Sequence, residues 1–147
     1  MIRVGDTLPP LTIEATPTFV VATALATRDF QDVHHDRDLA QAKGSQDIFV
    51  NILTDTGLVE RFVTDWAGPR ARIASITLKL GVPWYAHDTL TFTGEVVTLR
   101  QAQGAGGEAQ GAGAEAECGD TVEVAVTGTN PLGKHVISTV TFTLEEQ

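Results

Sequence analysis

The feature that most constrains the fold is a change of hydrophobic period after residue 70. Between residues 51 and 67 the apolar side chains recur at helical spacing, and Gly68-Pro69 then ends the segment. From residue 76 onward the apolar residues alternate with polar ones, the period of strands with one buried face. The apolar stripe is too broad for a surface helix, so the segment is predicted to be a buried central helix. Helices followed by an antiparallel meander indicate an α+β fold.

The remaining elements follow from the same two periods. Residues 11–15 alternate and are predicted to form a first strand. Thr18 is expected to cap a short helix over 19–26, which we favour over a strand at that place. A short polar helix is expected over 36–42, ended by Gly44. After the central helix, strands are expected at 76–82, 90–96, 122–126 and 136–144, with a turn at 130–133.

Length and charge limit the possible partners. The chain has 147 residues, which suits a single domain over 1–147. Ten basic against nineteen acidic residues argue against a nucleic-acid partner, because phosphate binding needs a concentrated basic face. Cys118 is the only cysteine, so no disulfide and no thiolate metal site is expected. With neither a signal-peptide segment nor an apolar run of membrane-spanning length, we expect a cytoplasmic protein without a membrane partner.

One stretch differs in composition from the rest of the chain. Residues 101–119 contain six Gly, six Ala and no bulky apolar side chain. Such a composition cannot offset the entropy lost on ordering, so the stretch is predicted to be a flexible loop joining two strands. Its glycines do not form the G-x-G-x-x-G pattern of a dinucleotide site. No cofactor is expected.

The residues with the clearest chemical meaning lie between the two short helices. Asp29 and His34 stand five positions apart, and such a pair can activate one water molecule: the carboxylate takes a proton and the imidazole orients or relays it. The alternative is a solvated polar loop in which Asp29 caps a helix and His34 only packs. A metal site built from His34, His35 and Asp36 is not expected, because adjacent histidines do not form a natural chelate.

The region around this pair resembles a known family. Residues 28–36 read R-D-F-Q-D-V-H-H-D and are similar to the G-D-x-N-P-[LI]-H motif of MaoC-type enoyl-CoA hydratases. Residues 47–54 and 81–90 resemble two further segments of that family, and the likeness covers nearly the whole chain except 101–119. Within the family, the chain looks most like the small subunit of the actinobacterial two-chain steroid side-chain enoyl-CoA hydratases. The motif departs from the family at three positions: Arg28 for Gly, Gln31 for Asn and Asp32 for Pro.

The resemblance implies a hotdog fold, in which a five-stranded antiparallel sheet wraps a long central helix. It also implies syn addition of water across an α,β-unsaturated acyl-CoA. Asp29 takes a proton from the water, while His34 holds that water and manages the proton delivered to the α-carbon. The backbone N–H of Asn51, at the start of the central helix, stabilises the thioester oxyanion, and its side chain is expected near the acyl group. A steroid side-chain thioester, in sterol catabolism, is implied by the resemblance alone.

The resemblance also bears on assembly. A single hotdog domain leaves sheet edges to be covered, and its basic residues are scattered. We therefore expect a second, larger MaoC-like subunit to complete a heterotetramer. Two alternatives stay open: a non-catalytic hotdog subunit, and a hotdog acyl-CoA thioesterase, whose carboxylate usually lies on or just before the central helix. Asp47 and Asp55 are the candidate carboxylates for a thioesterase, and neither is expected to have a histidine beside it.

Overall fold

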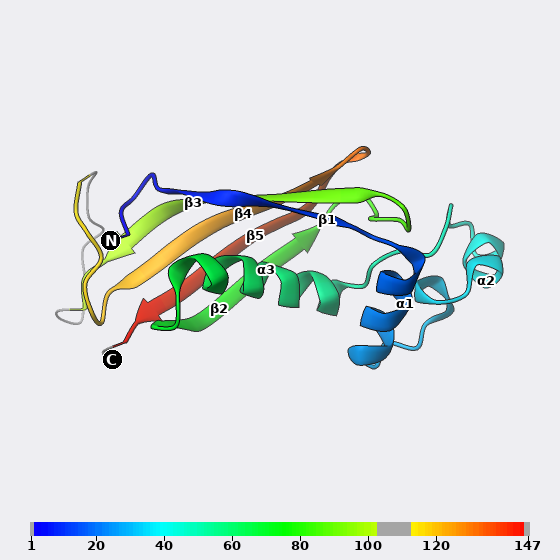
Figure 1. Cartoon of the computed structure of the whole chain (residues 1–147), viewed down its shortest axis with the longest axis horizontal. Coiled ribbons are helices and arrows are strands. Elements are labelled where there is room, and N and C mark those ends of the chain that lie inside the picture. Colours follow the sequence, from blue (N-terminus) through cyan, green and yellow to red (C-terminus); the bar gives the residue numbers. More distant parts are fainter. Residues whose placement is uncertain (1, 103–112, 146–147) are drawn as a thin grey trace.

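The computed structural model describes residues 2–102 and 113–145, whose strands form one antiparallel sheet with a long helix against one face (Figure 1). The strands are β1 (Thr7–Glu14), β2 (Ala71–Leu80), β3 (Thr89–Arg100), β4 (Thr121–Asn130) and β5 (Gly133–Leu144). Their order across the sheet is β1-β3-β4-β5-β2, and every neighbouring pair is antiparallel. The helices are α1 (Pro17–Ala26), the 3-10 turn η1 (Asp32–His34), α2 (Arg37–Ala42) and α3 (Ile52–Ala67). The α+β class predicted from the sequence is confirmed.

The central helix α3 begins and ends at clear signals. The Asn51 side-chain oxygen accepts a hydrogen bond from the Thr54 N–H at 3.1 Å, which satisfies one of the free donors of the first turn. Gly68 ends the helix in a left-handed conformation with φ of 85°. Burial of each large apolar side chain contributes roughly 1.5–3 kcal/mol, so packing rather than propensity holds this helix. The buried apolar residues of α3 are Leu58, Val59, Phe62 and Val63.

The first helix starts earlier than the sequence predicts. Thr18 was the expected cap, but Thr16 takes that role, and its hydroxyl accepts a hydrogen bond from the Phe19 N–H at 3.1 Å. The expected cap is wrong because Pro17 already fits the first helical position: its fixed φ suits the helix, and it lacks only an N–H that would have had no partner there.

The strands bury alternate residues, as the period of two predicts. β4 and β5 pair along their whole length and supply much of the core, and they are joined by the predicted turn. In that turn the Asn130 side-chain oxygen accepts hydrogen bonds from the N–H groups of Leu132 at 2.9 Å and Gly133 at 3.2 Å. β2 is longer than expected, because it continues back to Ala71 along β5.

The Gly/Ala-rich stretch 101–119 lies partly outside the described residues, which omit 103–112. In its described part, Glu115 forms an isolated antiparallel bridge with Arg3. The buried carboxylate of Asp120 accepts hydrogen bonds from the N–H groups of Ala102 at 3.1 Å and Glu117 at 2.8 Å. These bonds hold the two ends of the stretch together, and the flexible loop between them stays a prediction. None of the helices in the described part of the chain is long and apolar enough to cross a membrane.

Candidate active site

The structure brings Asp29 and His34 together at the end of the sheet where α1, η1 and the start of α3 meet (Figure 1). His34 Nε2 lies 3.4 Å from Asp29 Oδ2. The side chain of His34 is 7% exposed and that of Asp29 is 18% exposed. The carboxylate therefore keeps some access from outside, while the imidazole is almost wholly enclosed.

Asp29 is placed by the way α1 ends. Arg28 adopts a left-handed conformation with φ of 58°. Its N–H donates to the Leu25 carbonyl at 3.0 Å, and the Asp29 N–H donates to the Ala24 carbonyl at 2.9 Å. These two bonds form the Schellman ending, which usually has Gly where this chain has Arg28. The arginine follows the path of a glycine, at a conformational cost of about 1 kcal/mol.

His34 is fixed in one orientation and one tautomer. Its Nδ1 lies 2.7 Å from the Phe49 carbonyl oxygen, and its ring packs edge-on against the Phe49 ring at 4.9 Å between centroids. A carbonyl can only accept, so Nδ1 carries the hydrogen. In neutral His34, Nε2 is consequently the proton-accepting atom, and it faces Asp29.

The Asn51 side chain lines the candidate cavity, and its polar atoms bind groups of the protein itself. Its Nδ2 donates to Asp29 Oδ2 at 3.0 Å and to Thr27 Oγ1 at 2.8 Å, while its oxygen caps α3. The whole residue is 3% exposed. One side chain thus starts the central helix and orients the Asp29 carboxylate.

The backbone N–H of Asn51 meets no acceptor among residues 2–102 and 113–145. It lies at the N-terminal end of α3, where the helix dipole favours negative charge. A ligand oxygen placed there gains both a donor and a favourable field. This position fits the oxyanion role predicted for Asn51.

A cavity of about 380 Å³ opens beside the Asp29–His34 pair. Its volume lies within the roughly 300–1,000 Å³ typical of small-molecule sites. Most of its lining surface is apolar, which suits an acyl chain with one polar reacting centre. The lining residues are Asp29, Gln31, His34, Phe49, Val50, Asn51, Ile52, Leu80, Gly81, Val82, Pro83 and His135.

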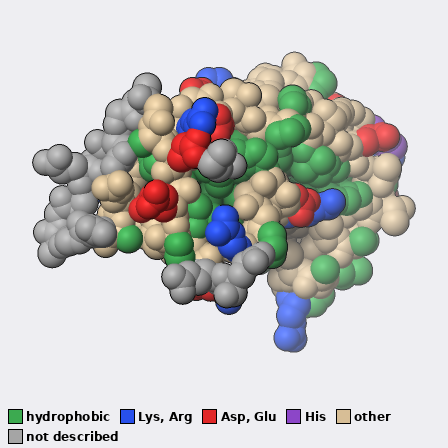
Figure 2. Space-filling view, turned by 60° about the vertical axis from the view of Figure 1, so that its left-hand side comes forward, with side chains coloured by type: hydrophobic (Ala, Val, Ile, Leu, Met, Phe, Trp, Pro, Cys, Tyr) green, Lys and Arg blue, Asp and Glu red, His purple; other side chains and the backbone are tan. Residues whose placement is uncertain are grey.

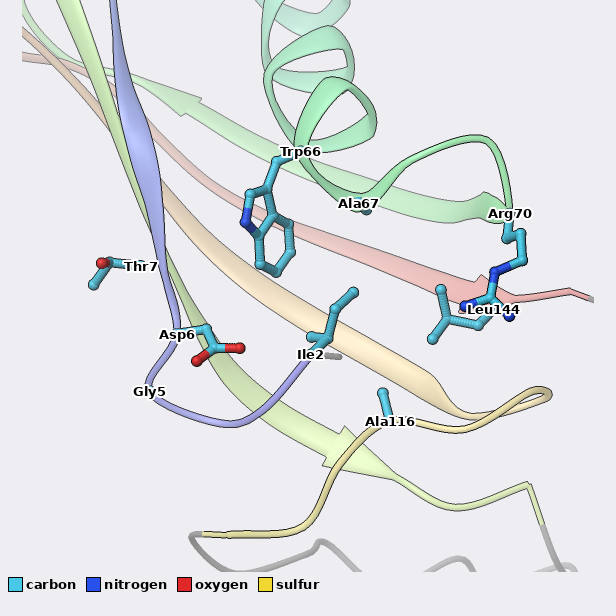
Figure 3. Close-up of a pocket in the computed structure, with 9 residues that line it drawn as sticks. All are labelled: Ile2, Gly5, Asp6, Thr7, Trp66, Ala67, Arg70, Ala116 and Leu144. Carbon is cyan, nitrogen blue, oxygen red and sulfur yellow. The ribbon is translucent and has the colours of Figure 1, made fainter.

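A larger cavity, about 560 Å³, lies near the far end of α3 (Figure 3). Trp66 projects into it, and none of the described residues that line it is a histidine. The Asp6 carboxylate there accepts a hydrogen bond from the Arg3 N–H at 2.8 Å. Figure 2 shows the molecular face toward this end, where Lys and Arg side chains stand singly among acidic and apolar ones. Without an acid–base pair, this cavity is a poorer candidate for catalysis than the smaller one.

A second Asp–His pair, whose histidine lines the smaller cavity, was not predicted from the sequence. His135 Nε2 on β5 lies 3.0 Å from Asp55 Oδ2 in the first turn of α3. The expectation that Asp55 has no histidine beside it is therefore wrong. The two residues are 80 positions apart, and strand order rather than local spacing brings them together. The alternation of apolar and polar residues along β5 does not indicate that the imidazole at its start is buried.

Burial and the contact between the two groups together determine the protonation of this second pair. The side chains of Asp55 and His135 are 0% and 2% exposed. Burial raises the pKa of the Asp55 carboxyl, an effect that the hydrogen bond from His135 only partly opposes. Burial alone would lower the pKa of His135, but the hydrogen bond and charge of Asp55 outweigh it and the pKa is raised. Both directions favour retention of a proton within the pair.

Asp47, the other candidate thioesterase carboxylate, is engaged in an ion pair. Arg37 Nε lies 2.8 Å from its Oδ1, which also accepts from the Ile48 N–H at 2.8 Å. Burial would raise the pKa of Asp47, but these two donors outweigh it and the pKa is lowered. Within residues 2–102 and 113–145, no three His, Cys, Asp or Glu side chains converge in a way that could hold a metal ion.

No family model matches the chain. The 3-oxo-4,17-pregnadiene-20-carboxyl-CoA hydratase beta subunit of Mycobacterium tuberculosis is 55% identical over 146 residues, which cover 99% of either chain. Among solved structures, a chain of the ChsH1-ChsH2 complex from Mycobacterium tuberculosis aligns with a TM-score of 0.82 and 56% identity, over 99% of this chain and 100% of that one. An (R)-hydratase from A. caviae involved in PHA biosynthesis has a TM-score of 0.78 at 17% identity, over 97% of each chain, and shares the fold.

Proposed function

The chain belongs to the MaoC-like hotdog hydratases, the family expected from its sequence. On this basis we propose that it is the catalytic subunit of an enoyl-CoA hydratase. One observation carries the proposal. Asp29 and Nε2 of His34 face each other at the edge of a largely apolar cavity. A water molecule held between them lies where it can attack an enoyl group bound in that cavity.

The contacts of the pair suggest how the proton moves. Asn51 holds Asp29 Oδ2, whereas Oδ1 has only a long contact of 3.4 Å with the Gln31 N–H. Oδ1 is therefore the atom that takes the proton as the water oxygen bonds to the β-carbon. His34 Nε2 holds the same water. It then relays the proton from Asp29 to the α-carbon, so Asp29 ends in its starting state. Acid–base help of this kind is worth about 10²–10⁴-fold in rate.

As the carbon–oxygen bond forms, negative charge develops on the thioester oxygen. In the proposed mechanism the Asn51 N–H at the start of α3 donates a hydrogen bond to that oxygen, and the helix dipole further stabilises the negative charge. Because the donor belongs to the main chain, this role does not depend on the Asn51 side chain. That side chain orients Asp29 instead.

For the substrate we propose a steroid side-chain acyl-CoA in sterol catabolism. The supporting observation is the 55% identity, over nearly the full length of both chains, to a subunit named for 3-oxo-4,17-pregnadiene-20-carboxyl-CoA. The apolar lining of the cavity fits such an acyl group. The single Cys118, exposed and unpaired in the described structure, suits a reducing compartment, and we propose the cytoplasm as the place of reaction.

We further propose that the chain works in a heterotetramer with a second MaoC-like subunit. One relative of known structure is a chain of a ChsH1-ChsH2 complex. In the present structure, Ile52 lines the cavity yet is 48% exposed, and its neighbour Leu53 is 53% exposed. The rim of the cavity therefore needs cover from another chain, and the edge strands β1 and β2 each have one free side within the described sheet.

The thioesterase alternative gains an observation from the Asp55–His135 pair, because a carboxyl on the central helix does have a histidine. Asp55, however, is fully buried and does not line the cavity. A carboxyl that cannot reach a thioester carbon cannot attack it or activate water beside it. Asp29 and His34 line the cavity, which favours hydration over thioester hydrolysis and over a non-catalytic role.

The direct test is a paired assay of the co-expressed complex with the MaoC-like partner. An enoyl-CoA and the matching saturated acyl-CoA are supplied side by side, and water addition and CoA release are both followed. We expect water addition without CoA release. CoA release from the saturated thioester would instead identify a thioesterase, and no reaction with either would favour a non-catalytic subunit.

A further inference from the structure

We propose that the first turn of α3 is a clamp with two arms that fixes the width of the cavity. In this clamp Asn51 holds Asp29 in the cavity lining, and Asp55, acting through His135, holds Val82 in the same lining. Asp55 and His135 are then positioning residues. The inference rests on the proposed function, since hydration is one of its readouts.

The two arms start from the same face of one helix turn. Asn51 and Asp55 are four positions apart, and the Asp55 N–H donates to the Asn51 carbonyl at 3.2 Å. The first arm is the Asn51 amide, which binds Asp29 and Thr27. Any movement of this turn is therefore transmitted to the catalytic carboxylate.

The second arm runs from the helix to the sheet and on to Val82 in the cavity lining. Asp55 Oδ2 binds His135 Nε2 at 3.0 Å, and His135 Nδ1 donates to the Val82 carbonyl at 2.6 Å. Both ring nitrogens are thus engaged, and the ring also packs against Trp84 at 5.9 Å between centroids. With no free nitrogen, His135 lines the cavity without being able to exchange a proton with a substrate.

The wall that this arm reaches is a tight unit attached to β5. The N–H groups of Gly81 and Val82 donate to the carbonyls of His135 at 2.8 Å and Lys134 at 3.1 Å. The Pro83 carbonyl accepts from Asn130 Nδ2 at 2.8 Å. A Cβ at Gly81 would lie 2.3 Å from the Lys134 carbonyl oxygen, so no other residue fits this approach. Asp55 connects this wall to the same helix turn that holds Asp29.

The buried pair is poorly suited to a purely stabilising role. Asp55 Oδ1 is buried with no hydrogen-bond partner among the described residues. Leaving such an atom unsatisfied works against stability, and buried ion pairs are often replaced by apolar side chains at no loss. A pair that keeps this disadvantage is better explained by the geometry it imposes on Val82.

The test compares two substitutions of Asp55 in the complex with the MaoC-like partner. Asp55→Asn keeps the link, because its amide can donate to Nε2 of neutral His135, whereas Asp55→Ala removes it. Asp65→Asn, an exposed change on the same helix, is the matched control. Each protein is assayed for KM and kcat with a short and a bulky enoyl-CoA, and for binding of a saturated acyl-CoA by calorimetry.

We expect Asp55→Asn and Asp65→Asn to stay within about threefold of the wild type. Asp55→Ala is expected to lower kcat/KM on the order of 10- to 100-fold, mainly through KM, because a displaced wall misplaces the substrate. Its preference between short and bulky substrates should change, and the saturated acyl-CoA should bind more weakly by a similar factor.

Two results would overturn the clamp. One is an Asp55→Ala complex whose kcat falls while KM and substrate preference stay as in the wild type, which indicates only a loss of folded protein. The other is an Asp55→Asn complex as impaired as Asp55→Ala, which indicates a need for the charge.

If Asp55→Ala does not fold, His135→Asn and His135→Gln replace it. Asn places its amide near the position of Nδ1 and should retain more substrate binding than Gln, and equal binding by both would contradict the clamp. The calorimetric arm reports on the wall even if the complex does not hydrate an enoyl-CoA.

Discussion

The chain contains two Asp–His pairs with the same internal arrangement and different surroundings. In each, His Nδ1 faces a backbone carbonyl and Nε2 faces a carboxylate oxygen, in His34 with Asp29 and in His135 with Asp55. The Asp29 pair lines the cavity and its carboxylate is 18% exposed, whereas Asp55 is fully buried. The same two groups therefore suit water activation in one place and wall positioning in the other, and access to the cavity decides between the two.

The largest expected effect is the loss of turnover when the Asp29–His34 pair is changed. Asp29→Asn and His34→Ala should each lower hydration by about 10²–10⁴-fold, the scale of lost acid–base help, while the complex stays folded. Steady-state hydration of an enoyl-CoA measures this, with circular dichroism to verify folding. His35→Ala, at the exposed neighbouring histidine, is the control and should leave turnover unchanged. Near-normal turnover by Asp29→Asn in an assembled complex would end the proposed mechanism.

For stability we expect the opposite order, with a larger effect of substitution in the Asp55–His135 pair than in the Asp29–His34 pair. Asp55→Ala leaves His135 buried without its partner, and we expect the free energy of unfolding to fall by about 3 kcal/mol. Asp29→Ala, in a partly exposed loop, should change it by less than about 1 kcal/mol. Urea unfolding of both variants measures the difference. Equal losses in the two variants would show that burial does not distinguish the pairs.

The buried pair also predicts a pH dependence. The pKa of His135 is raised, so its stabilising contribution is complete below about pH 6.5 and is lost as the pH rises through the higher folded-state pKa. The pKa of Asp55 is raised by burial, so folding favours its protonated form and that contribution is likewise lost as the pH rises above about 3.8.

A double variant, Asp55→Asn with His135→Asn, lacks both titrations. The advantage in unfolding free energy of the wild type over this variant should therefore shrink between about pH 6 and pH 9, measured by urea unfolding at several pH values. A difference that stays constant across this range would show that the pair holds no extra proton in the folded state.

The smallest expected effect concerns Arg28, the residue directly before Asp29. Arg28→Gly relieves a left-handed conformation at the end of α1 and should raise the free energy of unfolding by about 0.5–1 kcal/mol, a few degrees in Tm. Ala22→Gly, at an exposed position within α1, is the matched control and should lower it by about 1 kcal/mol. Thermal unfolding compares the two, and a loss of stability in Arg28→Gly would show that the arginine side chain offsets its backbone strain.

The two pairs also mark how far the sequence alone reaches. The change of period predicted α3 and the meander, because helix and strand periods depend only on neighbouring residues. Asp29 and His34 lie in one short loop, so their proximity followed from spacing, and family resemblance gave them roles. The link between Asp55 and His135 depends on strand order and on the packing of α3 over β5, which no local pattern contains. The second role of Asn51 escaped for a similar reason, since the direction of its side chain depends on where α1 ends.

The Asp120 carboxylate, which binds the N–H groups of Ala102 and Glu117, has an evolutionary consequence. Because it holds both ends of the intervening segment at one point, the register between β3 and β4 does not depend on the length of that segment. Closure entropy grows only slowly with length, so we expect insertions and deletions there to be nearly neutral for the fold. Among descendants of one ancestral gene, this is the place where we expect chain length to vary most.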